Sequence, residues 1–172
     1  TKNNPNPGLE VETKIIQAQV IPSLVEISKD ESTFMLVMGS TGASDLVDKL
    51  FGSVSSTVAQ KAHCPVLLVP KGKSFSSYQN ILYASNEESD DEHMVRRIKS
   101  FNADFGAALH FIHIMNNEDE DAFKESEEKI FDALFKHGDP LFSFNISNIK
   151  SRFIVDGLLK YTHDHKIDLM VL

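Results

Sequence analysis

Five apolar residues in a row, 34–38 (Phe-Met-Leu-Val-Met), lead directly into a glycine, and this junction is the strongest constraint on the fold. A continuous apolar run of this length is typical of a strand buried on both faces, as in a parallel sheet. Gly39 and Gly42 follow the run, and Gly52 precedes a segment with the character of a helix. A second short apolar run, residues 64–70, predicts another buried strand. Strand, glycine turn, loop, helix and strand make up one crossover of an α/β fold.

The spacing of these glycines is compatible with a phosphate site. A glycine at the carboxyl end of a strand lets the backbone turn sharply and approach a ligand closely. A helix N-terminus offers unpaired N–H groups and a partial positive charge, so Gly52 and Ser53 stand where an anion would bind. Such glycines also shape turns in α/β proteins that bind nothing, and spacing alone leaves both interpretations open. They match neither the P-loop nor the dinucleotide-binding G-x-G-x-x-G pattern.

Residues 34–70 resemble the universal stress protein family. The resemblance lies in Val-Met-Gly-Ser-Thr-Gly at 37–42, nine further residues, Gly-Ser-Val at 52–54, and His-Cys-Pro-Val-Leu-Leu-Val-Pro at 63–70. ATP-binding members of the family carry this pattern as G-2x-G-9x-G-(S/T), and other members lack ATP binding. The resemblance implies a Rossmann-like α/β fold similar to the adenine nucleotide alpha hydrolases. It also implies a cytoplasmic stress-response protein that binds ATP, with Mg²⁺, or a related adenine nucleotide.

The resemblance also implies roles for individual residues. Gly39 and Gly42 would let the loop approach the phosphates and ribose. The N–H groups of Gly52, Ser53 and Val54 would hold phosphate with the Ser53 and Ser55 hydroxyls assisting, and Met38 would line the adenine. The residues concerned are Met38, Gly39, Ser40, Gly42, Gly52, Ser53, Val54 and Ser55.

Asn86 stands where ATP-binding relatives have an aspartate that contacts the nucleoside, just after the strand predicted at 80–85. An asparagine keeps an acceptor but loses the charge and adds donors, so it would bind a hydroxyl more weakly. A simple turn residue is the alternative interpretation.

Predicted strands and helices alternate along the chain, which favours a parallel sheet covered by helices. Alternating residues predict a half-buried strand at 9–15, before a short helix at 23–29. The remaining predictions are helices at 54–62, 90–103, 122–137 and 153–165, and strands at 80–85, 107–115, 141–149 and 167–172.

This order predicts a tandem protein of which the chain holds a middle section. Residues 1–71 would be the C-terminal half of a first stress-protein repeat, 72–78 a linker, and 79–172 the N-terminal part of a second repeat. Two arrangements stay open: a fragment of a longer tandem chain, or one composite domain in which the two parts complete each other's sheet.

The composition of the chain argues against some classes of binding partner. A net charge of −8 and a pI near 5.3 argue against a nucleic-acid surface. No apolar run reaches the length of a membrane-spanning helix. The single cysteine, Cys64, fits a reducing cytoplasm. His110 and His113 lie on opposite faces of one predicted strand and do not converge, so no metal site is expected.

Two other functions compete with nucleotide binding. In the first, the glycines only shape a turn, and the strand at 65–69 pairs across a homodimer or between repeats, because a short apolar edge strand needs such cover. The second is a weak ATPase, for which Asp45 and Asp48 are the only candidates. No catalytic residues are assigned.

Overall fold

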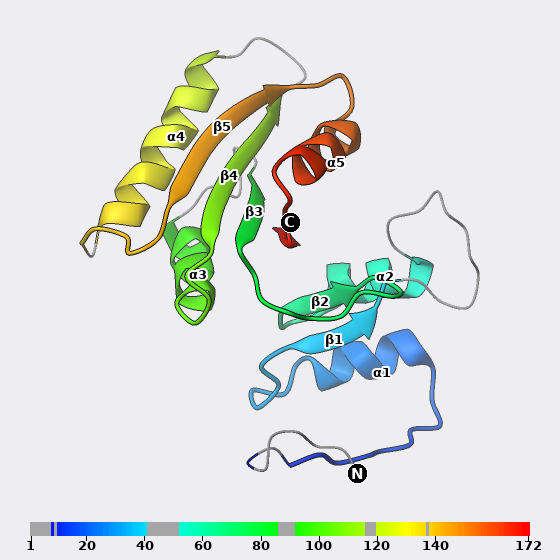
Figure 1. The fold of residues 1–172 in the computed structure, drawn as a ribbon. Coiled ribbons are helices and arrows are strands. Elements are labelled where there is room, and N and C mark those ends of the chain that lie inside the picture. The colour runs from blue at the N-terminus through cyan, green and yellow to red at the C-terminus, as the bar shows by residue number, and fades with distance from the viewer. Residues whose placement is uncertain (1–7, 9, 41–51, 86–91, 116–119, 137) are drawn as a thin grey trace. The chain divides into compact units, whose positions relative to one another are not determined.

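A computed structural model of the chain describes residues 8, 10–40, 52–85, 92–115, 120–136 and 138–172 (Figure 1). The chain divides into two compact units, Thr1–Phe75 (unit 1) and Ser76–Leu172 (unit 2). The elements of unit 1 are α1 (Val20–Ile27), β1 (Leu36–Gly39), α2 (Ser53–Lys61) and β2 (Val66–Val69). The elements of unit 2 are β3 (Asn80–Ser85), α3 (Glu92–Asn102), β4 (Ala108–Met115), α4 (Glu120–Phe135), β5 (Phe144–Lys150), α5 (Ile154–Asp164) and β6 (Leu169–Val171).

Unit 1 is a pair of parallel strands with two helices. β1 pairs with β2 in the register Leu36↔Val66 to Gly39↔Val69. The β1–β2 ladder continues past the end of β1, because the N–H of Ser40 donates to the carbonyl of Val69 at 3.0 Å. The crossover predicted around the glycines is therefore present, with α2 between the two strands.

Two sequence predictions for unit 1 are wrong. The half-buried strand predicted at 9–15 is absent from its described residues, 10–15, which form no strand and are exposed, Ile15 by 91%. The run at 34–38 is not buried on both faces, because Phe34 and Val37 are 81% and 63% exposed. A strand buries both faces only when helices or sheets cover both, and the described part of unit 1 supplies too little cover.

Unit 2 is a four-stranded parallel sheet in the order β5-β4-β3-β6. Strand order reverses at β3, which pairs with β4 on one side and with β6 on the other. In open α/β sheets a ligand binds outside the carboxyl ends of the strands at such a reversal. That end of β3 is Ser85, the residue before Asn86.

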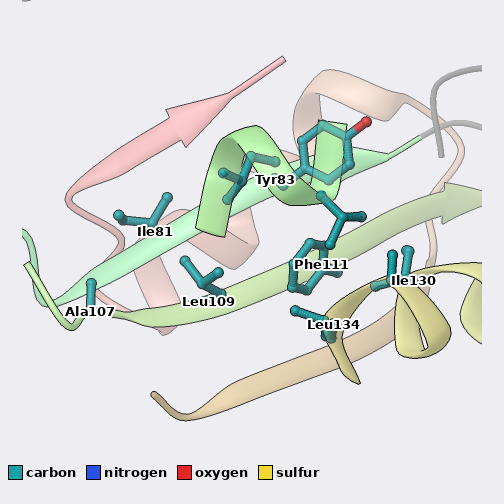
Figure 2. Close-up of a cluster of buried hydrophobic side chains, with 10 residues drawn as sticks. Ile81, Tyr83, Ala107, Leu109, Phe111, Ile130 and Leu134 are labelled. Atoms are coloured by element: carbon teal, nitrogen blue, oxygen red, sulfur yellow. The ribbon is translucent and has the colours of Figure 1, made fainter. Parts of the chain in front are cut away.

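Helices cover the unit 2 sheet (Figure 1), and its core has two layers, one on each face of the sheet. In the larger layer, side chains from β3 and β4 pack against α3 and α4; Figure 2 shows the ring of Phe111 of β4 next to Leu134 of α4. In the smaller layer, Leu82 and Ile112 pack against Leu158 and Tyr161 of α5. The fold is therefore α/β with a parallel sheet covered by helices, as the sequence predicts. No helix among the described residues is long and apolar enough to cross a membrane.

Candidate functional site

The predicted nucleotide site is only partly within the described residues. Gly42 and Asn86 lie outside them, as do the ATPase candidates Asp45 and Asp48. The residues that can be placed all belong to the end of β1 and the start of α2: Met38, Gly39, Ser40, Gly52, Ser53, Val54 and Ser55.

Hydrogen bonds to the carbonyl of Ser40 connect the end of β1 to the start of α2. It accepts the backbone N–H of Gly52 at 2.6 Å and the side-chain hydroxyl of Ser55 at 2.9 Å. The same hydroxyl lies 3.0 Å from the carbonyl of Gly52. Ser40 and Ser55 are both buried, with 3% of each residue exposed. The two ends of the segment 41–51 are therefore held together by buried hydrogen bonds that are local to the predicted site.

The N-terminus of α2 has the features of an anion site. Gly52 is its N-cap, with extended backbone angles (φ −67°, ψ 156°), and makes no side-chain cap because it has no side chain. No acidic residue stands in the first turn, and Ser53 and Val54 are exposed. The first N–H groups of a helix have no partner within the helix and carry its partial positive charge. Within its own first turn, the helix start therefore has no carboxylate that would compete with an oxyanion.

Ser55 has a different place from Ser53, although both are predicted to assist with phosphate. The hydroxyl of Ser55 is already engaged by Ser40 and Gly52, so the group it has left for a ligand is its backbone N–H. The exposed Ser53 carries its hydroxyl at the helix start itself. Met38, next to exposed Gly39 at the end of β1, pairs with Leu68 and is half-buried.

Sequence reasoning missed a second polar cluster, in unit 2. His110 of β4 lies 2.9 Å from the hydroxyl of Tyr161 through Nδ1 and 3.3 Å from Oδ1 of Asn80 through Nε2. His165 stacks on the ring of Tyr161 with the centroids 3.9 Å apart. Burial, and then the nearby His165, lower the pKa of His110 below its usual value of 6.5. The signal in the sequence was the four-residue spacing of Tyr161 and His165, which puts both on one side of the end of α5.

Other polar groups are weaker candidates. No group of three or more His, Cys, Asp or Glu among the described residues is placed to hold a metal ion. A shallow surface hollow of about 360 Å³ on α4 is lined by Glu127, Glu128, Phe131 and Asp132. Three carboxylates would repel a nucleotide phosphate, so this hollow is not a second site for the predicted ligand.

Residues 3–70 match the family model described as Universal stress protein family. Over 66 residues the chain is 36% identical to a universal stress protein of Methanocaldococcus jannaschii, which covers 38% of this chain and 39% of the relative. Over 59 residues it is 39% identical to a universal stress protein of Mycobacterium tuberculosis, which covers 34% of this chain and 19% of the relative. The matches thus span well under half the length of these curated relatives.

The fold is also similar to the crystal structure of a universal stress protein from Archaeoglobus fulgidus. The TM-score is 0.62 at 23% sequence identity, and the match covers 86% of this chain and 53% of that chain. A match of this coverage includes residues of both units, since neither unit alone accounts for that share of the chain.

Proposed function

Because residues 3–70 of this chain match the model of the universal stress protein family, we propose that unit 1 binds the phosphates of ATP or a related adenine nucleotide. The main support for this proposal is the hydrogen-bonded junction of β1 and α2 at Ser40. Its buried hydrogen bonds to Gly52 and Ser55 hold an exposed helix N-terminus, free of acidic residues, at the end of a strand. Backbone N–H groups and a helix dipole are what a phosphate needs.

Each residue at the junction has a defined part in this proposal. The N–H of Gly52, predicted from the sequence to hold phosphate, instead donates to the carbonyl of Ser40. The N–H groups of Ser53, Val54 and Ser55 would donate to phosphate oxygens, and the Ser53 hydroxyl would add a further donor. The exposed Gly39 would let a ligand approach the backbone, since no side chain covers it. Met38 would contact the adenine, and Gly42 belongs to the same motif.

For unit 2, taken by itself, we propose that Asn86 contacts the nucleoside of an adenine nucleotide. It follows β3 at the reversal of strand order in unit 2, where α/β sheets bind their ligands. Any Mg²⁺ would come with the nucleotide, because this ion keeps several of its waters and takes phosphate oxygens as ligands. The proposed role is that of a cytoplasmic stress-response module that acts by association. A weak ATPase activity has no assigned residue among those described.

The domain arrangement remains a proposal. The same helix–strand order appears twice, as α1–β1 in unit 1 and as α5–β6 in unit 2, which fits the end of one repeat followed by the start of another. A match that spans both units and about half of a longer stress protein also supports this arrangement.

Calorimetry with ATP and Mg²⁺ on the full chain tests phosphate binding at α2. We expect Gly52→Asp to abolish binding, because a carboxylate at the helix start would repel phosphate and occupy its N–H groups. Gln60→Asp is the matched control: Gln60 is exposed in the last turn of the same helix, and the change adds the same charge at the opposite end. Equal binding by both variants and the parent would rule out this helix start as the phosphate site.

A second function, pairing through β2, is favoured by one observation. In the described residues β2 pairs only with β1, and this leaves its other edge unpaired. Since Pro65 and Val69 accept N–H groups from β1, the N–H of Leu68 faces the outer edge in a parallel ladder.

Light scattering tests this alternative. If β2 forms an interface, Leu68→Pro would convert a dimer to a monomer, because proline removes the outward N–H. Leu68→Ala is the control, because it removes the same side chain but keeps that N–H. A monomeric parent protein would exclude homodimerisation through this edge.

A further inference from the structure

The polar cluster around His110 lies at the amino end of the unit 2 sheet, on the face that α5 covers. His110 and Asn145 are register partners on β4 and β5, and Asn80 is the first residue of β3. Tyr161 and His165 come from the end of α5. The cluster is therefore at the end of the unit 2 strands opposite to Ser85.

The hydrogen bonds of the cluster form a directed chain. Oδ1 of Asn80 is only an acceptor, so the Nε2 of His110 carries a proton and donates to it. If the ring is neutral, Nδ1 is then the acceptor for the hydroxyl of Tyr161. That hydroxyl in turn accepts Nδ2 of Asn145, at 3.3 Å. Every partner is satisfied when His110 is neutral.

A second proton on His110 breaks this order. The Nδ1 atom would become a donor, so the Tyr161 hydroxyl would lose the acceptor that it now has. The charge would form in a partly buried place, with the ring of His165 centred 5.7 Å away. Both burial and His165 act against the charged form, and they lower the pKa of His110.

The remaining neighbours do not compensate for that charge. Asn80 and Asn145 are neutral, and Tyr161 is protonated at neutral pH because burial raises its pKa. The carboxylate of Asp168, before β6, accepts the backbone N–H groups of Gln79 and Asn80. None of the ion pairs among the described residues involves His110.

We propose that His110 is an acid-sensitive latch, which fastens the end of α5 to the sheet when neutral and releases it when protonated. The latch acts beside the packing of α5 on the sheet, in which Leu158 and Tyr161 meet Leu82 and Ile112. The same helix leaves Ile154, Val155 and Leu159 exposed. α5 leads into β6, which pairs with β3, the strand at which the strand order reverses. Release of α5 would therefore reach the reversal of strand order, where Asn86 follows β3.

The direction of the pH effect follows from proton linkage. When the folded pKa lies below 6.5, the latched state binds fewer protons than the open one, so the latch is strongest above pH 6.5. It weakens as the pH falls from 6.5 through the folded pKa, and then levels off. Each pH unit between the two pKa values increases the open population by about tenfold.

The test follows the full chain by NMR and hydrogen exchange at pH 7.0 and 5.5. In the parent we expect the His110 ring to titrate below 6.5. We also expect amides of α5, after correction for intrinsic exchange, to lose protection several-fold while those of α3 keep theirs. His110→Gln should remove the pH dependence of α5, and His163→Gln, on the exposed side of the same helix, should keep it.

Tyr161→Phe gives a second readout that a purely structural role would not move. Loss of the hydroxyl removes the donor that favours neutral His110, so the pKa of His110 should rise toward 6.5. A parent His110 that titrates at or above 6.5 overturns the latch. So does unchanged protection of α5 between the two pH values, and neither result depends on a variant that folds.

Discussion

The two units of this chain are held together by different means. Of the described apolar side chains that are buried, Val58 of α2 belongs to unit 1, and the others, such as Leu82, Leu109 and Phe111, belong to unit 2. Unit 1 instead exposes Ile15, and its candidate site depends on buried hydrogen bonds at Ser40. Unit 2 therefore has a core of its own, whereas the described part of unit 1 holds its candidate site with few buried apolar side chains.

The comparison predicts where substitutions are costly. In unit 2 the loss of packing should dominate, because apolar burial is the main favourable contribution to folding. In unit 1 the loss of a single hydrogen bond should be felt most at the site. Three substitutions sharpen or break this contrast, in order of decreasing expected effect.

Phe111→Ala should have the largest effect. Phe111 is 1% exposed, and its ring meets that of Tyr83 edge-on with centroids 6.0 Å apart. Removal of a buried aromatic ring costs about 3–5 kcal/mol in unfolding free energy. Urea denaturation, followed by NMR signals of unit 2 residues, would measure this loss of unfolding free energy. Leu141→Ala is the control, because Leu141 is fully exposed. A loss as small as that of the control would mean that the core of unit 2 is loosely packed.

Asn102→Ala should have an intermediate effect. The buried side chain of Asn102 donates to the carbonyl of Ala107 and accepts its N–H, both at 2.9 Å. Its loss leaves two backbone groups unpaired at the entrance to β4, which costs about 3 kcal/mol. Ser100→Ala, on the exposed surface of α3, is the matched control in the same denaturation experiment. Equal stability of the two variants would show that water replaces these bonds at no cost.

Ser55→Ala should have the smallest effect on stability and a clear effect on the site. The substitution removes the buried hydrogen bond from the Ser55 hydroxyl to the Ser40 carbonyl, which still accepts the N–H of Gly52. We expect the unfolding free energy to fall by about 1 kcal/mol. We expect weaker ATP binding in calorimetry, because the helix start is no longer fixed to the strand. Ser56→Ala, one residue along, should bind as the parent does. If Ser55→Ala also binds normally, the junction at Ser40 does not organise the site.

The order of elements was largely predictable from the sequence. Strands buried in a parallel sheet are short apolar runs, and the helices between them show apolar residues at helical spacing. The strand at 80–85 has the predicted bounds, and the α/β class is confirmed. The prediction of a strand at 9–15 was wrong. An alternation of apolar and polar residues indicates which side chains prefer burial, but not whether a neighbouring strand is available for pairing.

The polar interactions were less predictable. The glycine motif indicated the junction of β1 and α2, but nothing local shows that the Ser55 hydroxyl turns inward to Ser40. The His110 cluster depends on the pairing register of β4 with β5 and on the seating of α5, which single-sequence patterns do not specify. The roles assigned to the nucleotide-site residues stay predictions.

The most direct test of the account is a backbone amide NMR titration of the full chain with ATP and Mg²⁺. We expect the largest chemical-shift changes to fall on Ser53, Val54 and Ser55, and to be much smaller with adenosine, which has no phosphate. Amides at the end of α2, such as Lys61, should barely move. Saturable shifts that leave Ser53 to Ser55 unchanged, or shifts of equal size with adenosine, would contradict phosphate binding at the start of α2.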